Sequence, residues 1–305
     1  MDEIKIKQLP VSEEHTCAFH KKNKDGKNYE SSEILPHNMC PWLYHTLYPY
    51  YLTLLHGGKF DWNERGGVQV GCPAAEGINL VVKKRDNDGK VLFTIGERGK
   101  PSAWQEGDMF NRPTDIIVHP KTGELFISDG YGNSRVHKLS PEGKHIKSWG
   151  VPGSGDGEFS LPHNISMIGD DKVIVADREN FRLQIFSIDG EYLDQWHIHH
   201  PMSVTEGKND DKNLYVGEMG PPEVQHGVPG LGNRIVVLNP DGERITHFGN
   251  DLPGQNPDQF VAPHGVTTDS KGNVYVGEVA WTFWYSKKDP QPLGELVSLR
   301  KWIKK

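Results

Sequence analysis

The chain has 305 residues, and its 34 Lys and Arg against 41 Asp and Glu give a net charge of −7 at pH 7. This balance provides no general attraction to nucleic acid or to an anionic membrane surface. The mean hydropathy of −0.62, and the lack of any apolar run near the roughly 18 residues of a membrane helix, argue against a membrane span. The first residues lack the apolar segment of a secretory signal, and three cysteines suit no disulfide framework. We therefore expect a cytoplasmic protein.

The first part of the chain predicts a small α+β domain over residues 1–86. Strand-like segments at residues 3–9, 66–73 and 77–85 flank a stretch at 42–56 with the spacing of an amphipathic helix. A charged, turn-prone segment at 85–89 marks the junction with the second part of the chain. All three cysteines precede this junction, at Cys17, Cys40 and Cys72.

From residue 87 onward the chain repeats one plan. Residues 110–150 and 159–196 each lead from Phe and Pro into a short apolar strand, a strand ending in Asp, an Arg-containing strand and a last strand near Trp. Two further units begin at Pro201 and Phe260. A period of about 40 to 50 residues with several short strands is typical of β-propeller blades. We predict a mainly β chain in which residues 87–305 form four blades.

The segment 90–97 resembles the outermost strand of a blade but has no blade of its own. We expect it to complete the last blade, which closes the ring and removes two exposed sheet edges. The alternative is an incomplete ring that the N-terminal domain or a second subunit closes.

The blade sequences resemble NHL-repeat propellers, and among these the peptidyl-hydroxyglycine amidating lyases and their bacterial relatives. The resemblance rests on FNRPTD, SDGYGNSR, SPEGK, GEFSLPHN, VADRENFRLQIF and APHGV, and it covers about residue 90 to the C-terminus. It implies a lyase with zinc on three histidines, a tyrosine and arginines at the substrate. By position it assigns His163 and His264 to the zinc, and Tyr131 and Arg178 to the active site.

This sequence departs from the lyases in three respects. The lyases' first two blades, which carry their remaining zinc histidine and another arginine, have no counterpart here. Ala262 and Gly265 stand where the animal lyases have Met and Asp. Asn111 and Gly132 stand where the secreted lyases pair two cysteines, which agrees with a reducing compartment.

The N-terminal segment resembles a family of small, uncharacterised, cysteine-containing prokaryotic proteins. The matching run is CPWLYHTLYPYYLTLLHGGKFDW followed by VGCP, and the similarity covers nearly all of residues 3–85. It implies a fusion but no known activity. The thiols of Cys17, Cys40 and Cys72 could hold a metal or sense redox state, or they could be buried structural residues.

Two histidines are the candidate metal ligands. His163 and His264 both follow a Pro at the start of an innermost strand, in blades two and four. In a four-bladed ring these blades face each other, so the imidazoles should converge, and neutral imidazoles suit a divalent metal such as zinc. The alternative is that each Pro-His only begins a strand. Asp115, at the equivalent place in blade one, either completes the site and contacts substrate or shapes the channel.

Tyr131 and Arg178 are the candidate catalytic and substrate-binding residues. A phenol beside a metal or an arginine can act as a base, and an arginine can fix a carboxylate with two parallel bonds. The alternatives are that Arg178 pairs with Glu179 or Asp177 and that Tyr131 fills the channel mouth. Four acids occur at the end of the second strand of each blade, and they favour a structural role as acceptors of backbone N–H groups: Asp129, Asp177, Glu218 and Glu278.

Two functions of different class remain open. The first is a metal-dependent, lyase-like enzyme that acts on a small carboxylate-bearing substrate at the propeller axis, with zinc as the cofactor. The second is a non-catalytic NHL-type binding or scaffold propeller with a protein partner, in which the N-terminal domain is an adaptor or a redox or metal sensor.

Overall fold

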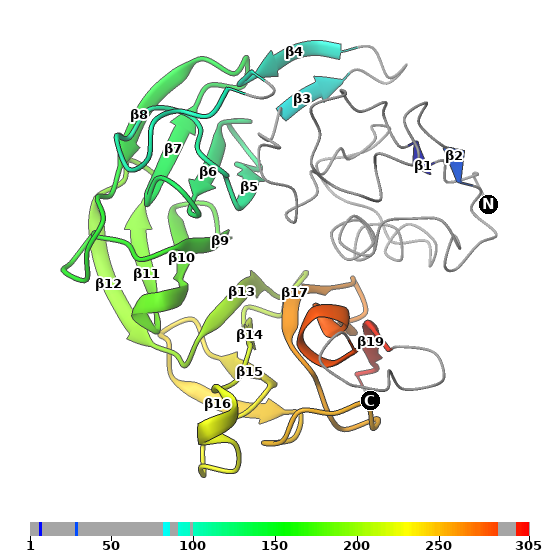
Figure 1. The fold of residues 1–305 in the computed structure, drawn as a ribbon. Helices are drawn as coiled ribbons and strands as arrows, with labels where there is room; N and C mark the ends of the chain where they lie inside the picture. The colour runs from blue at the N-terminus through cyan, green and yellow to red at the C-terminus, as the bar shows by residue number, and fades with distance from the viewer. Residues whose placement is uncertain are drawn as a thin grey trace.

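The structure, a computed structural model, describes residues 6–7, 28–29, 82–85, 91–97, 100–285 and 297–304. Four antiparallel sheets follow one another around an arc in chain order (Figure 1). Blade one contains β5 (Asp115–Val118), β6 (Leu125–Asp129), β7 (Arg135–Leu139) and β8 (His145–Trp149). Blade two contains β9 (Pro162–Ile168), β10 (Lys172–Asp177), β11 (Arg182–Ser187) and β12 (Tyr192–His197).

Blades three and four continue the same order. Blade three contains β13 (Pro201–Glu206), β14 (Leu214–Glu218), β15 (Arg234–Leu238) and β16 (Arg244–Phe248). Blade four has three described strands, β17 (Pro263–Thr268), β18 (Val274–Glu278) and β19 (Leu299–Trp302). The predicted mainly β propeller of four blades is confirmed.

The hydrophobic core lies between the blades. Ile174 and Leu183 of blade two pack with Leu214 and Val236 of blade three, and equivalent clusters join blades one and two and blades three and four. The second strands are buried along nearly their whole length, whereas the fourth strands are largely exposed. Each blade therefore stabilises its neighbours by burying apolar surface between sheets.

The repeated glycine turns lock one blade to the next. Gly190, in the turn before β12, has a φ of +77°, and a Cβ there would collide with the Trp149 ring of blade one. Gly242 has the same relation to Trp196 of blade two. Only glycine combines this left-handed backbone with so close an approach, so the Gly turn and the terminal Trp of the repeat form one contact between neighbouring blades.

The predicted placement of segment 90–97 in the last blade is wrong. β4 (Val91–Ile95) pairs with β3 (Val82–Arg85) in a two-stranded sheet beside blade one (Figure 1). Its Ile95 packs with Phe110 and Leu139 of blade one. A Cβ at Gly143 would collide with Phe93 of β4, the same relation that Gly190 has to Trp149. β4 therefore is an outer strand, as expected, but it precedes blade one instead of completing blade four.

The N-terminal expectations lie almost entirely outside the described residues. β1 (Ile6–Lys7) pairs with β2 (Asn28–Tyr29), and β1 falls in the expected first strand. Cys17, Cys40, Cys72 and the expected helix at 42–56 lie outside the described residues. Because the β3–β4 hairpin joins both sides of segment 85–89, the division into domains 1–86 and 87–305 stays a prediction. In the described part of the chain, no helix has the length and apolar character that crossing a membrane requires.

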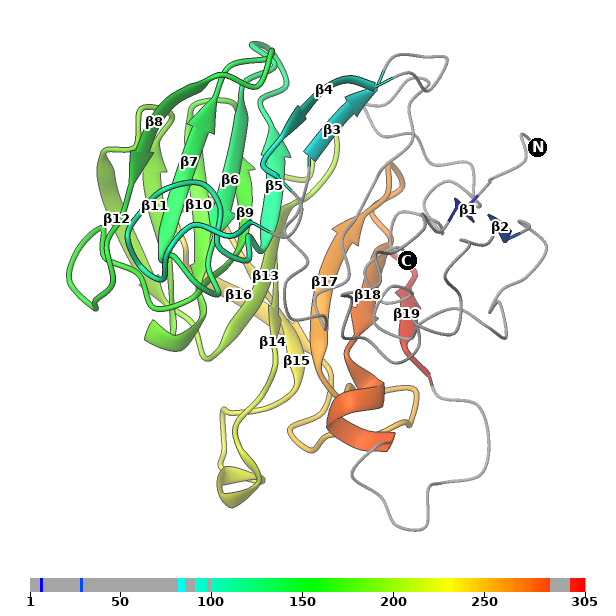
Figure 2. The same ribbon diagram turned by 45° about the horizontal axis from the view of Figure 1, so that its top comes forward.

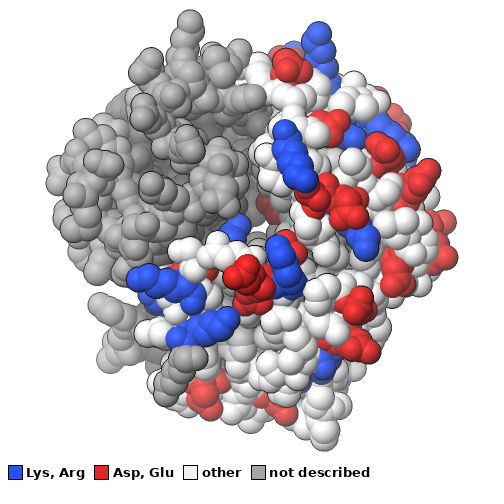
Figure 3. Space-filling model, turned by 180° about the vertical axis from the view of Figure 1, so that it is seen from behind, with Lys and Arg blue, Asp and Glu red and all other residues white. Residues whose placement is uncertain are grey.

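Two short helical segments project from the same end of the blades (Figure 2). They are η2 (Glu223–Gln225), in the long β14–β15 connection, and η3 (Trp281–Tyr285), which follows β18. On the face seen in Figure 3, acidic and basic residues are interspersed among the described residues.

Candidate functional site

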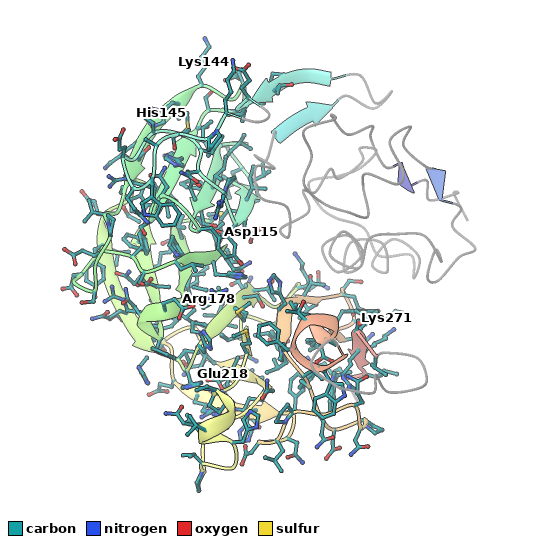
Figure 4. All side chains as sticks on the ribbon, in the orientation of Figure 1. Asp115, Lys144, His145, Arg178, Glu218 and Lys271 are labelled. Carbon is teal, nitrogen blue, oxygen red and sulfur yellow. The ribbon has the colours of Figure 1, made fainter. Side chains whose placement is uncertain are left out.

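The candidate residues lie where inner strands begin and second strands end. His163 and His264 are the second residues of β9 and β17, and Tyr131 and Arg178 follow β6 and β10. The Tyr131 and Arg178 N–H groups donate to the carbonyls of Arg112 and Leu161, at 3.3 Å each. These bonds tie each loop to the segment that leads into its own inner strand. Figure 4 places Arg178 toward the inner side of the arc, whereas Lys144 and His145 lie at its outer rim.

The two histidines converge, as the sequence predicts. The ring centroids of His163 and His264 are 4.7 Å apart, with an interplanar angle of 80°. His163 is buried and His264 is half-buried. Because adjacent inner strands are in contact from β9 through β13 to β17, blades two and four bring their imidazoles together at the axis.

His163 is held in one tautomer. Its Nδ1 lies 2.7 Å from the Met202 carbonyl oxygen, which only accepts hydrogen bonds, so Nδ1 carries the proton. Nε2 therefore keeps its lone pair, and the Tyr131 hydroxyl donates to it at 3.2 Å. Burial, followed by the nearby His264 and Arg178, holds the pKa of His163 well below its usual value. His163 is thus a neutral imidazole with a fixed lone pair.

Arg178 is positioned by three neighbours. Its guanidinium lies over the Tyr131 ring, 5.7 Å from the centroid, and Nη1 is 3.9 Å from the Met202 sulfur. Nε donates to Glu179 at 2.8 Å, so the pairing with Glu179 that the sequence leaves open is present. A contact with His200, together with the charge of Arg178, lowers the pKa of Glu179 to about 2. The pair consequently stays ionised at neutral pH and orients the guanidinium.

Asp115 binds Asn164 of the neighbouring blade. Its Oδ2 accepts from Asn164 Nδ2 at 2.5 Å and from the Ile165 N–H at 3.4 Å. Asn164 Oδ1 in turn accepts from the Val204 N–H at 2.7 Å, so one side chain links the inner strands of blades one, two and three. Burial of the carboxylate raises the pKa of Asp115 to about 7. The expected substrate contact of Asp115 stays a prediction.

The raised pKa of Asp115 predicts a pH-dependent stability. An acid whose pKa rises from 3.8 to about 7 on folding binds its proton more tightly in the folded state, so its contribution is complete below about pH 4 and is lost as the pH rises through about 7. We expect the unfolding free energy of the wild type to fall by about 2 to 4 kcal/mol more than that of Asp115→Asn between pH 4 and pH 8. Urea unfolding of both proteins across this range measures the difference, and parallel pH profiles would contradict it.

The four repeated acids have the structural role that the sequence favours. The Asp129 carboxylate accepts from the Asn111 N–H at 2.9 and 3.0 Å, and Asp177 accepts from the Ser160 N–H at 2.8 Å. Glu278 accepts from two backbone N–H groups in the same way. Asp177, Glu218 and Glu278 also each pair with a buried arginine of their own blade. These acids thus connect the second strand of a blade to the lead-in segment or to the third strand of the same blade.

The paired histidines fit part of a zinc site. A ligating His usually donates its other ring N–H to a carbonyl or carboxylate, which is the arrangement of His163 and Met202. Across the described ranges, no group of three or more His, Cys, Asp or Glu is placed to hold an ion. The two imidazoles can therefore supply two ligands, and the described residues supply no third.

The comparisons with known proteins agree with the fold. The NHL repeat family matches residues 159–186, within the first three strands of blade two and the segment that leads into it. The propeller is of the NHL type. A protein of unknown function from Bacteroides caccae superposes with a TM-score of 0.50 at 13% identity, over 72% of this chain and 70% of that one. At this identity the likeness supports the fold alone.

Two relatives carry enzyme names. The chain is 33% identical over 211 residues to the peptidylglycine alpha-amidating monooxygenase of Rattus norvegicus. This alignment covers 65% of this chain and 20% of that protein. The chain is 30% identical over 217 residues to the peptidyl-alpha-hydroxyglycine alpha-amidating lyase 1 of Drosophila melanogaster, which covers 64% of this chain and 38% of that protein. The match thus spans well under half of either relative, and it relates this NHL propeller to amidating enzymes.

Sequence reasoning missed three groups around the cluster. The Met202 carbonyl fixes the His163 tautomer, Asn164 links three blades, and His200 lies 3.5 Å from Glu179. His200 precedes Pro201 as Leu161 precedes Pro162, and this position before a proline is the sequence signal for His200. Both residues have a positive φ in the structure. A backbone carbonyl has no such signal, because every residue carries one.

Proposed function

We propose that the chain is a metal-dependent lyase that acts on a small carboxylate-bearing substrate at the propeller axis, with zinc as the metal. The observation that carries this proposal is the convergence of His264 and Tyr131 on His163, with 4.7 Å between the two imidazole centroids and 3.2 Å between the Tyr131 hydroxyl and His163 Nε2. A bound divalent metal would act as a Lewis acid on a substrate oxygen. His163, through Nε2, and His264 would hold the metal, and the Tyr131 hydroxyl lies beside that nitrogen, 3.2 Å away.

The protein residues then have separate roles. Arg178, already oriented by Glu179 at 2.8 Å, would bind the substrate carboxylate through its Nη groups. Once the Tyr131 hydroxyl has lost its own proton to solvent, the phenolate oxygen would take the proton of the substrate hydroxyl. For an N-acyl-α-hydroxyglycine, the kind of compound that the name of the Drosophila relative indicates, loss of that proton forms a C=O bond while the C–N bond breaks. The leaving nitrogen takes up a proton, which gives glyoxylate and a primary amide.

Replacement of Arg178 tests whether this residue binds the substrate carboxylate. We expect Arg178→Gln to weaken binding of the carboxylate substrate by about tenfold to a hundredfold, since a hydrogen bond between charged groups contributes about 1.5 to 3 kcal/mol. The measurement is the KM for glyoxylate release from a small N-acyl-α-hydroxyglycine by zinc-loaded protein. Arg244→Gln, in the outer strand β16, is the matched control. Equal KM values for Arg178→Gln and the control would remove Arg178 from the substrate site.

The second candidate is a non-catalytic NHL-type binding propeller with the N-terminal domain as adaptor or sensor. The observation that favours it is the Arg178–Glu179 pair, which already occupies one edge of the guanidinium. This candidate predicts no bound metal at the histidines and no turnover of the small substrate.

A further inference from the structure

A recess lies between blades one and two, immediately beside the candidate site. It has a volume of about 570 Å³, within the range of small-molecule sites, roughly 300 to 1,000 Å³. Loops of blade one form one wall and the segment that leads into blade two forms the other. Its lining residues include Trp104, Tyr131, Ser154, Phe159, Leu161 and Glu179.

The walls of the recess are largely apolar. Trp104 is 62% exposed, although a large aromatic side chain gains free energy from burial. The buried Phe159 and the half-buried Leu161 line the opposite wall. An apolar group bound here would cover Trp104 and contact Leu161, so the recess offers hydrophobic surface to a ligand of matching size.

The backbone of the recess is fixed in an unusual conformation. Three of its lining residues are not glycine and yet have positive φ: Gln105 at 59°, Ser134 at 52° and Leu161 at 61°. The Gln105 N–H donates to the Gly132 carbonyl at 2.8 Å, and Asn180 Nδ2 donates to the Gly153 carbonyl at 2.8 Å. Such conformations cost free energy and gather at ligand sites, where the surroundings hold them. The recess is therefore a preformed feature.

The recess is continuous with the candidate site through two residues. Tyr131 lines the recess, and its hydroxyl donates to His163 Nε2. Glu179 also lines the recess, and its carboxylate accepts from Arg178 Nε. A molecule whose carboxylate is bound by Arg178 thus has the recess next to its other end.

We propose that this recess binds the apolar, non-reacting end of the substrate; the inference rests on the proposed function. The Glu179 carboxylate at its edge disfavours a second anionic group there. The substrate class is therefore a monocarboxylate that bears a neutral aromatic or branched aliphatic group, and the space between the two blades sets the size of that group.

The test is a binding series on the zinc-loaded protein of residues 1–305. The probes are acetate, phenylacetate, 3-phenylpropionate and 4-phenylbutyrate, with 3-phenylpropan-1-ol as the uncharged analogue, and titration calorimetry gives each Kd. We expect the best phenyl carboxylate to bind the wild type about tenfold to a hundredfold more tightly than acetate, the gain for burying an aromatic ring. Ser154→Trp, which fills the recess, should abolish this gain, and Trp104→Ala should reduce it.

The controls separate the recess from the proposed function. Val151→Trp adds the same side chain at a nearby residue that is 44% exposed and does not line the recess, so it should keep the gain. A gain that survives Ser154→Trp, or no gain in the wild type, would overturn the inference. If the alcohol binds as tightly as the carboxylates and Arg178→Gln changes nothing, while Ser154→Trp still abolishes binding, the recess stands and the carboxylate site fails.

Discussion

Replacement of Tyr131 with Phe is expected to lower kcat for glyoxylate release about a hundredfold to ten-thousandfold, the usual contribution of a positioned general base. The change removes only the hydroxyl that lies 3.2 Å from His163 Nε2. The ring would keep its edge contact with His163, 5.8 Å between centroids, and its position under Arg178. Because the change leaves Arg178, the proposed binding residue for the substrate carboxylate, untouched, KM should change little.

Tyr275→Phe is the matched control for this experiment. Its hydroxyl donates to Asp269 at 3.0 Å in blade four, where it only joins two groups of the same blade. We expect the control to keep wild-type kcat. A Tyr131→Phe protein with wild-type kcat would exclude the phenol as the base and leave proton removal to another group.

Replacement of Asp177 with Ala is expected to destabilise the protein by about 3 to 5 kcal/mol, the cost of leaving a buried charge without its partner. Asp177 is fully buried and accepts from Ser160 N–H, Asn180 Nδ2 and Arg182 Nε, each at 2.8 Å. Without the carboxylate, the buried Arg182 loses its counter-charge and the lead-in segment of blade two loses its tether. The urea unfolding free energy at pH 7 measures this loss.

Asp189→Ala in the same blade provides the comparison. Its carboxylate lies 3.3 Å from Lys138 Nζ but is 76% exposed. Exposed ion pairs contribute about 0 to 1 kcal/mol, so we expect Asp189→Ala to unfold nearly as the wild type does. If the two alanine variants were equally stable, the repeated acids would not be the residues that stabilise the blades.

The blades could be predicted because their sequence signals have direct physical causes. Alternation of apolar residues indicates a strand packed between sheets. The Asp-Gly turn with a terminal Trp indicates the contact that Gly190 makes with Trp149. The neighbour of β4 could not be predicted from the same signals. Every outer strand of the repeat has a similar pattern. The pattern therefore identifies a strand as the outermost strand of a blade, but it does not identify the blade that the strand packs against. Packing of Phe93 and Ile95 on blade one decides the placement.

The site was partly predictable for a similar reason. His163 and His264 follow equivalent prolines, and equivalent positions of a propeller point to one axis, so their convergence followed from the repeat. The location of Asp115 at the axis followed as well, but its bond with Asn164 did not. That bond depends on the spacing between two adjacent inner strands, which no residue of either strand encodes alone.

The metal content of the protein of residues 1–305 tests the proposed histidine site most directly. Elemental analysis would be made after incubation with zinc and removal of the excess, for the wild type, for His163→Ala/His264→Ala, and for a Cys17, Cys40 and Cys72 triple Ala variant. A zinc site on His163 and His264 should give about one zinc per chain in the wild type and in the cysteine variant, and nearly none in the double histidine variant. A wild type that takes up no metal, or zinc that stays in the double histidine variant, would contradict it.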